Sequence, residues 1–194
     1  MEIFLVRHAE TDFTRDKRYC SVTDISLNEA GVQQALNLRD KLEILAADVI
    51  FCSTYKRTQQ TAQILFPQQE IALAPALAEL DFGEWEGLRY EELMSQCPRE
   101  YGNWLRDPYK YRPPGGEKMS ELEERTVGFL RDIFQHDAGK RIFCVSHAGP
   151  IKTMVCWLMH KERKDFWDLS IDLASVSYFK IKDREMIAYN LNQL

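Results

Sequence analysis

The sequence has 194 residues, of which 45% are hydrophobic and 28% charged, and these proportions are typical of one compact domain with a sizeable core. The formal net charge of −5, without any dense basic stretch, argues against a nucleic-acid-binding protein. No apolar run approaches the ~20 residues of a membrane span, and a first strand starting at Glu2 or Ile3 leaves no room for a signal peptide. We therefore expect a single cytoplasmic domain over residues 1–194, with no membrane contact.

Cysteine and histidine usage does not indicate a metal site. The five cysteines are widely spaced and form no C-x-x-C pair, so neither a disulfide framework nor a zinc knuckle is indicated. The four histidines include no H-x-x-x-H pair. We expect a protein without a bound metal or cofactor.

In the first part of the chain, short apolar runs alternate with helical patterns. The predicted elements are a strand over 3–6, a helix over 28–45, a strand over 49–52, a helix ending near Leu65 and a short strand over 71–73. Asn28 is placed to cap the first of these helices. Ser53 and Thr54 are expected to cap the second.

Residues 79–118 interrupt this alternation. Glycine and proline recur throughout the stretch, around short helical patches such as residues 90–95. Long irregular segments inside compact domains are usually functional. We expect an inserted cap over about residues 84–118, covering the edge of the sheet.

The last part of the chain returns to regular elements. The pattern predicts a helix over 120–135, a strand over 141–145, a helix over 150–159, and a hairpin of strands over 175–181 and 186–190 joined by residues 182–185. Alternating strands and helices indicate an α/β fold, a three-layer α/β/α sandwich with a mostly parallel central sheet. The hairpin adds antiparallel pairing to that sheet.

Polar residues follow three predicted strands at the point where each strand ends. They are Arg7-His8, Ser53 to Arg57, and Ser146-His147. Because ligands of such sheets bind at the carboxyl ends of the strands, these clusters are expected to converge on one edge. Arginine forks match phosphate oxygens, so the expected ligand is a phosphoryl group.

Six motifs occur in order from residue 3 to about residue 155. They are Arg7-His8-Ala9-Glu10-Thr11, residues 27–35 (LNEAGVQQA), residues 53–58 (STYKRT), residues 79–87 (ELDFGEWEG), Pro114-Gly115-Gly116-Glu117 and Ser146-His147-Ala148-Gly149. This set resembles the histidine phosphatase superfamily, in its phosphoglycerate mutase-like branch. The resemblance implies a phosphoglycerate mutase-like fold and phosphoryl-transfer chemistry without a metal.

The resemblance also implies roles for five residues. His8 would attack phosphorus to form a phosphohistidine, while its other ring nitrogen bonds a backbone carbonyl. Arg7, Arg57 and His147 would hold the three non-bridging oxygens, and these cationic neighbours would lower the pKa of His8. Glu79 would protonate the leaving oxygen as general acid and then activate water as base.

Several positions depart from the family's pattern. Ala9 and Ala148 replace the usual glycines, and Lys118 replaces a common serine. Lys152 replaces a frequent arginine. Thr14 stands where many members have an asparagine that touches the phosphate, so the resemblance carries only a hydroxyl contact to this substrate-binding position.

Some assignments stay open at this stage. The neighbouring carboxyl groups of Asp81 and Glu84 are alternatives for the proton donor. Three basic residues of the expected cap, Arg106, Lys110 and Arg112, are either solvated surface or contacts for the non-reacting part of the substrate. We keep these three as candidate substrate-binding residues.

The residues and the resemblance together predict a metal-independent phosphomonoesterase that hydrolyses a small phosphorylated metabolite through a phosphohistidine. The compact length and short cap are most similar to α-ribazole 5′-phosphate phosphatases of cobalamin nucleotide-loop assembly. The alternatives are a cofactor-dependent phosphoglycerate mutase, a broad-specificity phosphatase and a non-catalytic phosphate-binding regulatory protein. A homodimer paired through the terminal hairpin is also compatible with the sequence.

Overall fold

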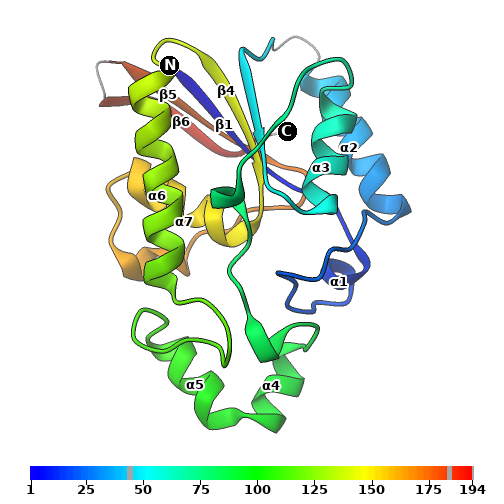
Figure 1. The fold of residues 1–194 in the computed structure, drawn as a ribbon, viewed down its shortest axis with the longest axis vertical. Coiled ribbons are helices and arrows are strands. Elements are labelled where there is room, and N and C mark those ends of the chain that lie inside the picture. The colour runs from blue at the N-terminus through cyan, green and yellow to red at the C-terminus, as the bar shows by residue number, and fades with distance from the viewer. Residues whose placement is uncertain (43–45, 183–184, 194) are drawn as a thin grey trace.

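A six-stranded mixed sheet lies between two layers of helices in the computed structural model, which describes residues 1–42, 46–182 and 185–193 (Figure 1). The strands are β1 (Glu2–Arg7), β2 (Val49–Cys52), β3 (Ala72–Leu73), β4 (Arg141–Ser146), β5 (Val176–Lys182) and β6 (Glu185–Gln193), in the order β3-β2-β4-β1-β5-β6. The first four strands pair in parallel, whereas β5 is antiparallel to both of its neighbours. The predicted sheet is confirmed, and of the predicted hairpin turn residues 183–184 lie outside the described residues.

Strand β1 has a core on each side because its side chains alternate between the two faces of the sheet. Ile3 and Leu5 pack with residues of α6 (Met119–His136) and α7 (Ala148–Leu158). Phe4 and Val6 pack with residues of α2 (Glu29–Leu42) and α3 (Lys56–Leu65). This arrangement confirms the three-layer α/β/α sandwich. Within the described residues, no helix is both long and apolar enough to cross a bilayer.

The predicted cap of α2 is correct. The Asn28 side-chain oxygen accepts a hydrogen bond from the main-chain nitrogen of Gly31 at 2.8 Å, in the first turn of the helix. The helix is described as far as Leu42, and residues 43–45 of the predicted range lie outside the described residues.

The predicted cap of α3 is wrong. The helix begins at Lys56, after an extended Tyr55 that makes no side-chain capping bond. The carboxylate of Asp24 accepts a hydrogen bond from the Lys56 main-chain nitrogen at 2.6 Å. A residue outside the helix thus provides a partner for the first N–H of the helix. The Ser53 hydroxyl lies too far upstream to cap the helix and instead bonds the His147 ring.

Helix α7 begins at Ala148, two residues before the predicted start. His147 is its extended N-cap residue, and Pro150 lies in the first turn, where a missing N–H costs no helical hydrogen bond. The helix therefore starts directly after β4, with one residue between the two elements.

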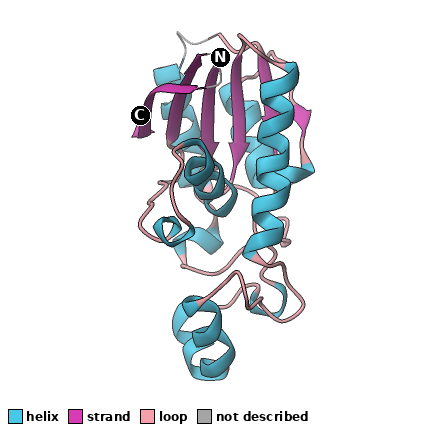
Figure 2. Ribbon diagram, turned by 90° about the vertical axis from the view of Figure 1, so that its left-hand side faces the viewer, coloured by secondary structure: helices cyan, strands magenta, loops and turns pink. Residues whose placement is uncertain are grey.

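Two short helices, α4 (Tyr90–Gln96) and α5 (Pro98–Arg106), lie beyond the carboxyl ends of the parallel strands (Figure 2). The buried side chains of Trp85, Tyr101 and Trp104 join Leu80 and Leu122 in a third apolar cluster. The remaining short elements are α1 (Asp12–Arg15) and the 3₁₀ turns η1 (Pro75–Leu77), η2 (Gly83–Trp85) and η3 (Arg163–Phe166).

Candidate active site

The three polar clusters that follow β1, β2 and β4 lie together, because these strands are adjacent and parallel. Arg7 is opposite Ser146 at the ends of β1 and β4, and Cys52 is opposite Val145. The chain therefore leaves all three strands at one edge of the sheet. The rings of the next residues, His8 and His147, have centroids 5.1 Å apart.

The imidazole of His8 is held in one tautomer. Its Nδ1 atom lies 2.7 Å from the carbonyl oxygen of Ala9, and since a carbonyl can only accept, Nδ1 carries the proton. Nε2 makes no hydrogen bond with any residue that the structure describes. Burial, and then the guanidinium groups of Arg57 and Arg7, lower the pKa of His8 well below its ordinary value. The ring is therefore neutral, and its unprotonated Nε2 is available for attack.

Arg7 presents a buried donor without a partner. Its Nη1 atom donates to the carbonyl of Ile171 at 2.6 Å. Its Nε atom is buried and has no hydrogen-bond partner within the described part of the chain. An unsatisfied buried donor carries a desolvation cost, which an anionic oxygen bound at this position would offset.

Arg57 is fully buried and holds the loop of residues 20–23. Its Nη1 atom donates to the carbonyl of Thr23 at 3.0 Å, and its Nη2 atom donates to those of Ser21 at 2.9 Å and Cys20 at 3.4 Å. The Glu86 carboxylate holds the other side of the same loop by accepting from the main-chain nitrogens of Ser21 and Thr23. One N–H of Nη1 is left for a ligand.

Both ring nitrogens of His147 have protein partners. Arg57 Nε lies 3.3 Å from Nδ1, and because a guanidinium only donates, Nδ1 is the acceptor. Nε2 therefore carries the proton and donates to the Ser53 hydroxyl at 2.9 Å. Burial and the nearby Arg57 lower the pKa of His147 well below its ordinary value, so this ring is also neutral.

The carboxyl group of Glu79 is partly buried at the start of α7. It accepts from the main-chain nitrogen of Gly149 at 3.2 and 3.3 Å and from that of Leu80 at 2.9 Å. Burial raises the pKa of Glu79, against the opposing effect of these hydrogen bonds and of Arg57 and Arg7. A carboxyl group with a raised pKa can carry a proton at a pH where an exposed glutamate is ionised.

A cavity of about 150 Å³ opens beside Glu79. Its walls are mainly apolar and aromatic: Tyr19, Leu80, Phe82, Trp104, Met119, Leu122, Ala148, Phe166 and Trp167. Lys152 is the basic residue of this lining, with its Nζ atom 5.2 Å from the centroid of the Phe166 ring. The cavity can therefore receive an apolar or aromatic group next to a carboxyl group and an ammonium group.

The other candidate residues have different surroundings. The Thr14 hydroxyl donates to the carbonyl of Thr11 at 2.9 Å, within the N-terminal cap of α1. Arg112 pairs with Glu121 at 3.0 Å. Asp81 accepts from the main-chain nitrogen of Gly83.

Two basic candidates, Arg106 and Lys110, line a second cavity, of about 560 Å³, together with Arg163 and Lys164. Trp167 lines both this cavity and the one beside Glu79. Arg106 and Lys110 thus share a cavity with two basic residues, Arg163 and Lys164, that the sequence did not connect with them.

Three side chains that organise the site were not identified from sequence. Glu86 lies in the motif of residues 79–87 and Glu117 in the motif of residues 114–117, so their place in these motifs could have marked them as site residues. Arg125 is an ordinary charge of a predicted amphipathic helix and gave no local signal. It donates to the main-chain carbonyl of Glu79 at 3.1 Å.

No group of three or more histidine, cysteine, aspartate or glutamate side chains that could hold a metal ion occurs within residues 1–42, 46–182 and 185–193.

Comparison with known proteins gives one family and relatives that match along nearly the whole chain. The family model of the histidine phosphatase superfamily (branch 1) matches residues 3–193. Phosphoserine phosphatase 1 of Hydrogenobacter thermophilus is 31% identical, over 99% of this chain and 92% of that relative. Adenosylcobalamin/alpha-ribazole phosphatase of Escherichia coli is 26% identical, over 95% of this chain and 92% of that relative. The crystal structure of the alpha-ribazole phosphatase from Shigella flexneri superposes with a TM-score of 0.92 at 27% identity, covering 100% of this chain and 96% of that chain.

Proposed function

Because the chain belongs to the histidine phosphatase superfamily (branch 1), we propose that it is a metal-independent phosphomonoesterase whose covalent intermediate is a phosphohistidine at His8. Its phosphatase-named relatives support the class of phosphoric monoester hydrolases. Two observations carry the proposal: His8 Nε2 is unprotonated, and the buried Arg7 Nε has no hydrogen-bond partner among the described residues. His8 Nε2 can act as the nucleophile, and Arg7 Nε can donate a hydrogen bond to an anionic oxygen of the substrate.

In the first proposed step, His8 Nε2 forms a bond to phosphorus while the bond from phosphorus to the ester oxygen breaks. The protonated Glu79 carboxyl gives its proton to the departing oxygen, so that an alcohol leaves and Glu79 becomes ionised. Arg7 Nε, the remaining N–H of Arg57 and the Nε2–H of His147, released from Ser53, would donate to the non-bridging oxygens.

In the second proposed step, water hydrolyses the phosphohistidine. The ionised Glu79 takes a proton from a water molecule, the oxygen of that water attacks phosphorus, and the bond from phosphorus to His8 Nε2 breaks. Inorganic phosphate leaves, with Glu79 protonated and His8 neutral again. A single carboxyl group can serve both steps because burial raises its pKa, which favours the protonated form before the first step, and the first step leaves it ionised for the second.

For the substrate, we propose α-ribazole 5′-phosphate. Its nucleoside carries an aromatic ring, and the cavity beside Glu79 is lined mainly by aromatic and apolar side chains. The relatives named as alpha-ribazole phosphatases support the same choice. We also propose that the segment over about residues 84–118 acts as a cap on this cavity, since its Trp104 forms part of the wall.

Phosphoserine is the second candidate, favoured by one feature of the same cavity. The ammonium group of Lys152 makes no ion pair with any described residue, and its half-buried position lowers its pKa. A substrate carboxylate would pair with it. The identity to phosphoserine phosphatase 1 supports this alternative.

Hydrolysis of p-nitrophenyl phosphate in the presence of EDTA tests the reaction. The native protein is expected to release nitrophenol, and the folded His8→Ala variant is expected to be inactive. No release by the native protein, or undiminished release by the variant, would contradict the mechanism. A labelled phosphoryl group on the protein that is lost in acid but retained in base identifies the phosphohistidine.

A panel of α-ribazole 5′-phosphate, phosphoserine and 3-phosphoglycerate tests the substrate. A preference of kcat/KM for α-ribazole 5′-phosphate supports the first proposal. A preference for phosphoserine that Lys152→Met abolishes supports the second. Conversion of 3-phosphoglycerate to 2-phosphoglycerate without release of phosphate would instead identify a mutase.

A further inference from the structure

The segment that carries Glu79 has no regular secondary structure to hold it. The 3₁₀ turn η1 ends at Leu77, and the chain then continues in extended form at Ala78. Carbonyl groups in such a segment need partners, because an unpaired polar group away from water costs free energy. Side chains from two other elements provide these partners.

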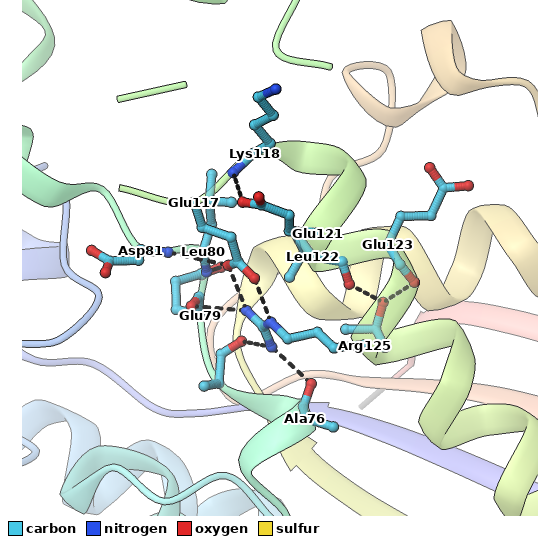
Figure 3. A network of polar contacts seen from close by, with 12 residues as sticks. Ala76, Glu79, Leu80, Asp81, Glu117, Lys118, Glu121, Leu122, Glu123 and Arg125 are labelled. Atoms are coloured by element: carbon cyan, nitrogen blue, oxygen red, sulfur yellow. Dashed lines mark hydrogen bonds and ion pairs between the residues drawn. The ribbon is translucent and has the colours of Figure 1, made fainter. Parts of the chain in front are cut away.

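Four consecutive carbonyl groups of this segment accept hydrogen bonds from two side chains, Arg125 and Ser146. Arg125 donates through Nη1 to Ala76 and Ala78, both at 2.8 Å, and through Nη2 to Glu79 at 3.1 Å. The Ser146 hydroxyl donates to the remaining carbonyl, that of Leu77, at 2.7 Å. Figure 3 shows the Arg125 guanidinium at the centre of this network.

Glu117 completes the surroundings of the guanidinium. Its two carboxylate oxygens accept from Arg125 Nε at 2.7 Å and from Nη2 at 2.9 Å. The five N–H donors of the guanidinium are thus all engaged, two by Glu117 and three by the carbonyls of residues 76, 78 and 79. The Glu117 main-chain nitrogen also donates to the Asp81 carbonyl at 2.8 Å, which fixes the segment on the far side of Glu79.

Within the described residues, the Glu79 carboxyl group itself is held only through main-chain atoms. Its hydrogen-bond partners in the described chain are the nitrogens of Leu80 and Gly149. Its position therefore depends on where the backbone of residues 76–81 lies. Bidentate pairing with Glu117 compensates the charge of Arg125. Arg125 can therefore hold this backbone without adding an uncompensated cation beside a carboxyl group that must be protonated before the first step.

We propose that Arg125, compensated by Glu117, is a positioning residue that places the Glu79 carboxyl group for proton transfer. This inference rests on the proposed acid–base role of Glu79. Arg125 does not touch the reacting atoms. It acts through the backbone of residue 79, and a displacement of about 1 Å in such a group can cost on the order of 100-fold in rate.

Two substrates of similar shape isolate the proton-transfer step. Benzyl phosphate and p-nitrophenyl phosphate both carry one aromatic ring, but the benzyl alkoxide needs protonation to leave, whereas nitrophenolate leaves without it. The parameter to compare is kcat/KM, because it covers the steps up to departure of the leaving group and omits the later hydrolysis. A loss confined to benzyl phosphate reports a failure of the acid.

The expected result for Arg125→Gln is a fall in kcat/KM on the order of 10- to 100-fold for benzyl phosphate, with p-nitrophenyl phosphate turned over at a near-native rate. Arg125→Lys, which keeps the charge but loses the planar fork, should fall between the native protein and Arg125→Gln. Glu117→Gln should show the same selective loss to a smaller degree. This variant replaces Arg125→Gln in the test if Arg125→Gln does not fold.

Arg141 provides a matched control. It also pairs with a carboxylate, Glu2 at 2.9 Å, and donates to a main-chain carbonyl, that of Ala46 at 3.2 Å, but it lies at the opposite end of β4. Arg141→Gln removes contacts of the same two kinds, though fewer of them, and should leave the ratio of the two kcat/KM values unchanged. Thermal unfolding of each variant shows how much stability it has lost.

Glu79→Gln distinguishes a failure of the proposed acid–base role of Glu79 from a failure of the inference about Arg125. It should lower kcat/KM for benzyl phosphate by about 10²- to 10⁴-fold and spare p-nitrophenyl phosphate. If Glu79→Gln shows no such selectivity, the proposed role of Glu79 is wrong. If it does, but Arg125→Gln and Glu117→Gln affect both substrates equally or neither, Arg125 only stabilises the fold and the inference is overturned.

Discussion

The main-chain nitrogen of Gly149 lies 3.2 and 3.3 Å from the two carboxylate oxygens of Glu79, in the first turn of α7. A β carbon at position 149 would collide with Glu79 Oε1. Position 148, where the family usually has glycine, carries alanine in this chain, so the two neighbouring positions are under different constraints. A side chain at position 149 would therefore have to displace the Glu79 carboxyl group.

Gly149→Ala is expected to displace Glu79 and to lower kcat/KM for benzyl phosphate on the order of 100-fold. The control is Gly128→Ala in α6, where an added β carbon meets nothing within 4 Å. That variant should keep full activity and gain about 0.5–1 kcal/mol in the free energy of unfolding, because alanine favours a helix over glycine. Equal activities of the two variants would contradict this account of Gly149.

The pH dependence of kcat/KM should be bell-shaped. Activity rises as His8 loses its proton, at a pH well below the ordinary histidine value of about 6.5, because burial, Arg57 and Arg7 lower its pKa. Activity falls again as Glu79 ionises, above the ordinary glutamate value of about 4.3, because burial raises its pKa. Ionisation of the substrate contributes equally to the pH profile of every variant, so a difference between two profiles comes from the protein. The alkaline limb should disappear in Glu79→Gln with benzyl phosphate, and its persistence would assign that limb to another group.

The two buried histidines should make the protein sensitive to acid. His8 and His147 have lowered pKa values in the folded state, so below about pH 6.5 the unfolded state binds more protons. The free energy of unfolding should therefore fall with decreasing pH, by up to about 1.4 kcal/mol per pH unit for each histidine. The raised pKa of Glu79 acts in the opposite direction, since its contribution is lost as the pH rises through that pKa.

Urea unfolding at several pH values between 5 and 7.5 measures this slope. His8→Asn should reduce it by up to about 1.4 kcal/mol per pH unit at the acid end of this range. His136→Asn, on the exposed end of α6, is the control for the same substitution outside the buried site. A slope insensitive to His8→Asn would mean that this ring is not neutral in the folded protein.

Glu86→Gln should release the loop that Arg57 holds. The Glu86 carboxylate accepts from two main-chain nitrogens of the loop and from the Ser21 hydroxyl, and the amide offers one acceptor oxygen and no charge. We expect a loss of about 1–3 kcal/mol in the free energy of unfolding and a fall in kcat/KM on the order of 10- to 100-fold for p-nitrophenyl phosphate. Glu84→Gln, exposed in the same turn, should change neither quantity.

The regular elements and the edge of the sheet that carries the site could be predicted from local pattern. Strand β1 reads as a continuous apolar run because both of its faces are buried, and Arg7 and His8 mark the point where it leaves the core. The order of the strands then brings His147 next to His8. These features follow from periodicity and from the general geometry of parallel sheets.

Contacts between distant segments could not be predicted in this way. The Ser53 hydroxyl has the chemistry of a helix cap, but His147, 94 residues later in the sequence, takes it instead. Arg125 has the spacing of a solvated helical residue, and only the fold brings the carbonyls of residues 76–79 to its guanidinium. In both cases a tertiary partner overrides the local preference of the side chain.

The position of β1 at the centre of the sheet has a consequence for biosynthesis. Ile3 is paired with Ile142 of β4 on one side and with Phe179 of β5 on the other, so the strand synthesised first finds its partners among those synthesised last. Pairing across such long stretches of chain makes folding slow and leaves apolar segments unpaired on the ribosome for most of translation. The strand that carries His8 thus has no partner until β4 has been synthesised, and an N-terminal fragment that ends before β4 lacks both sheet partners of β1 and the His147 side chain.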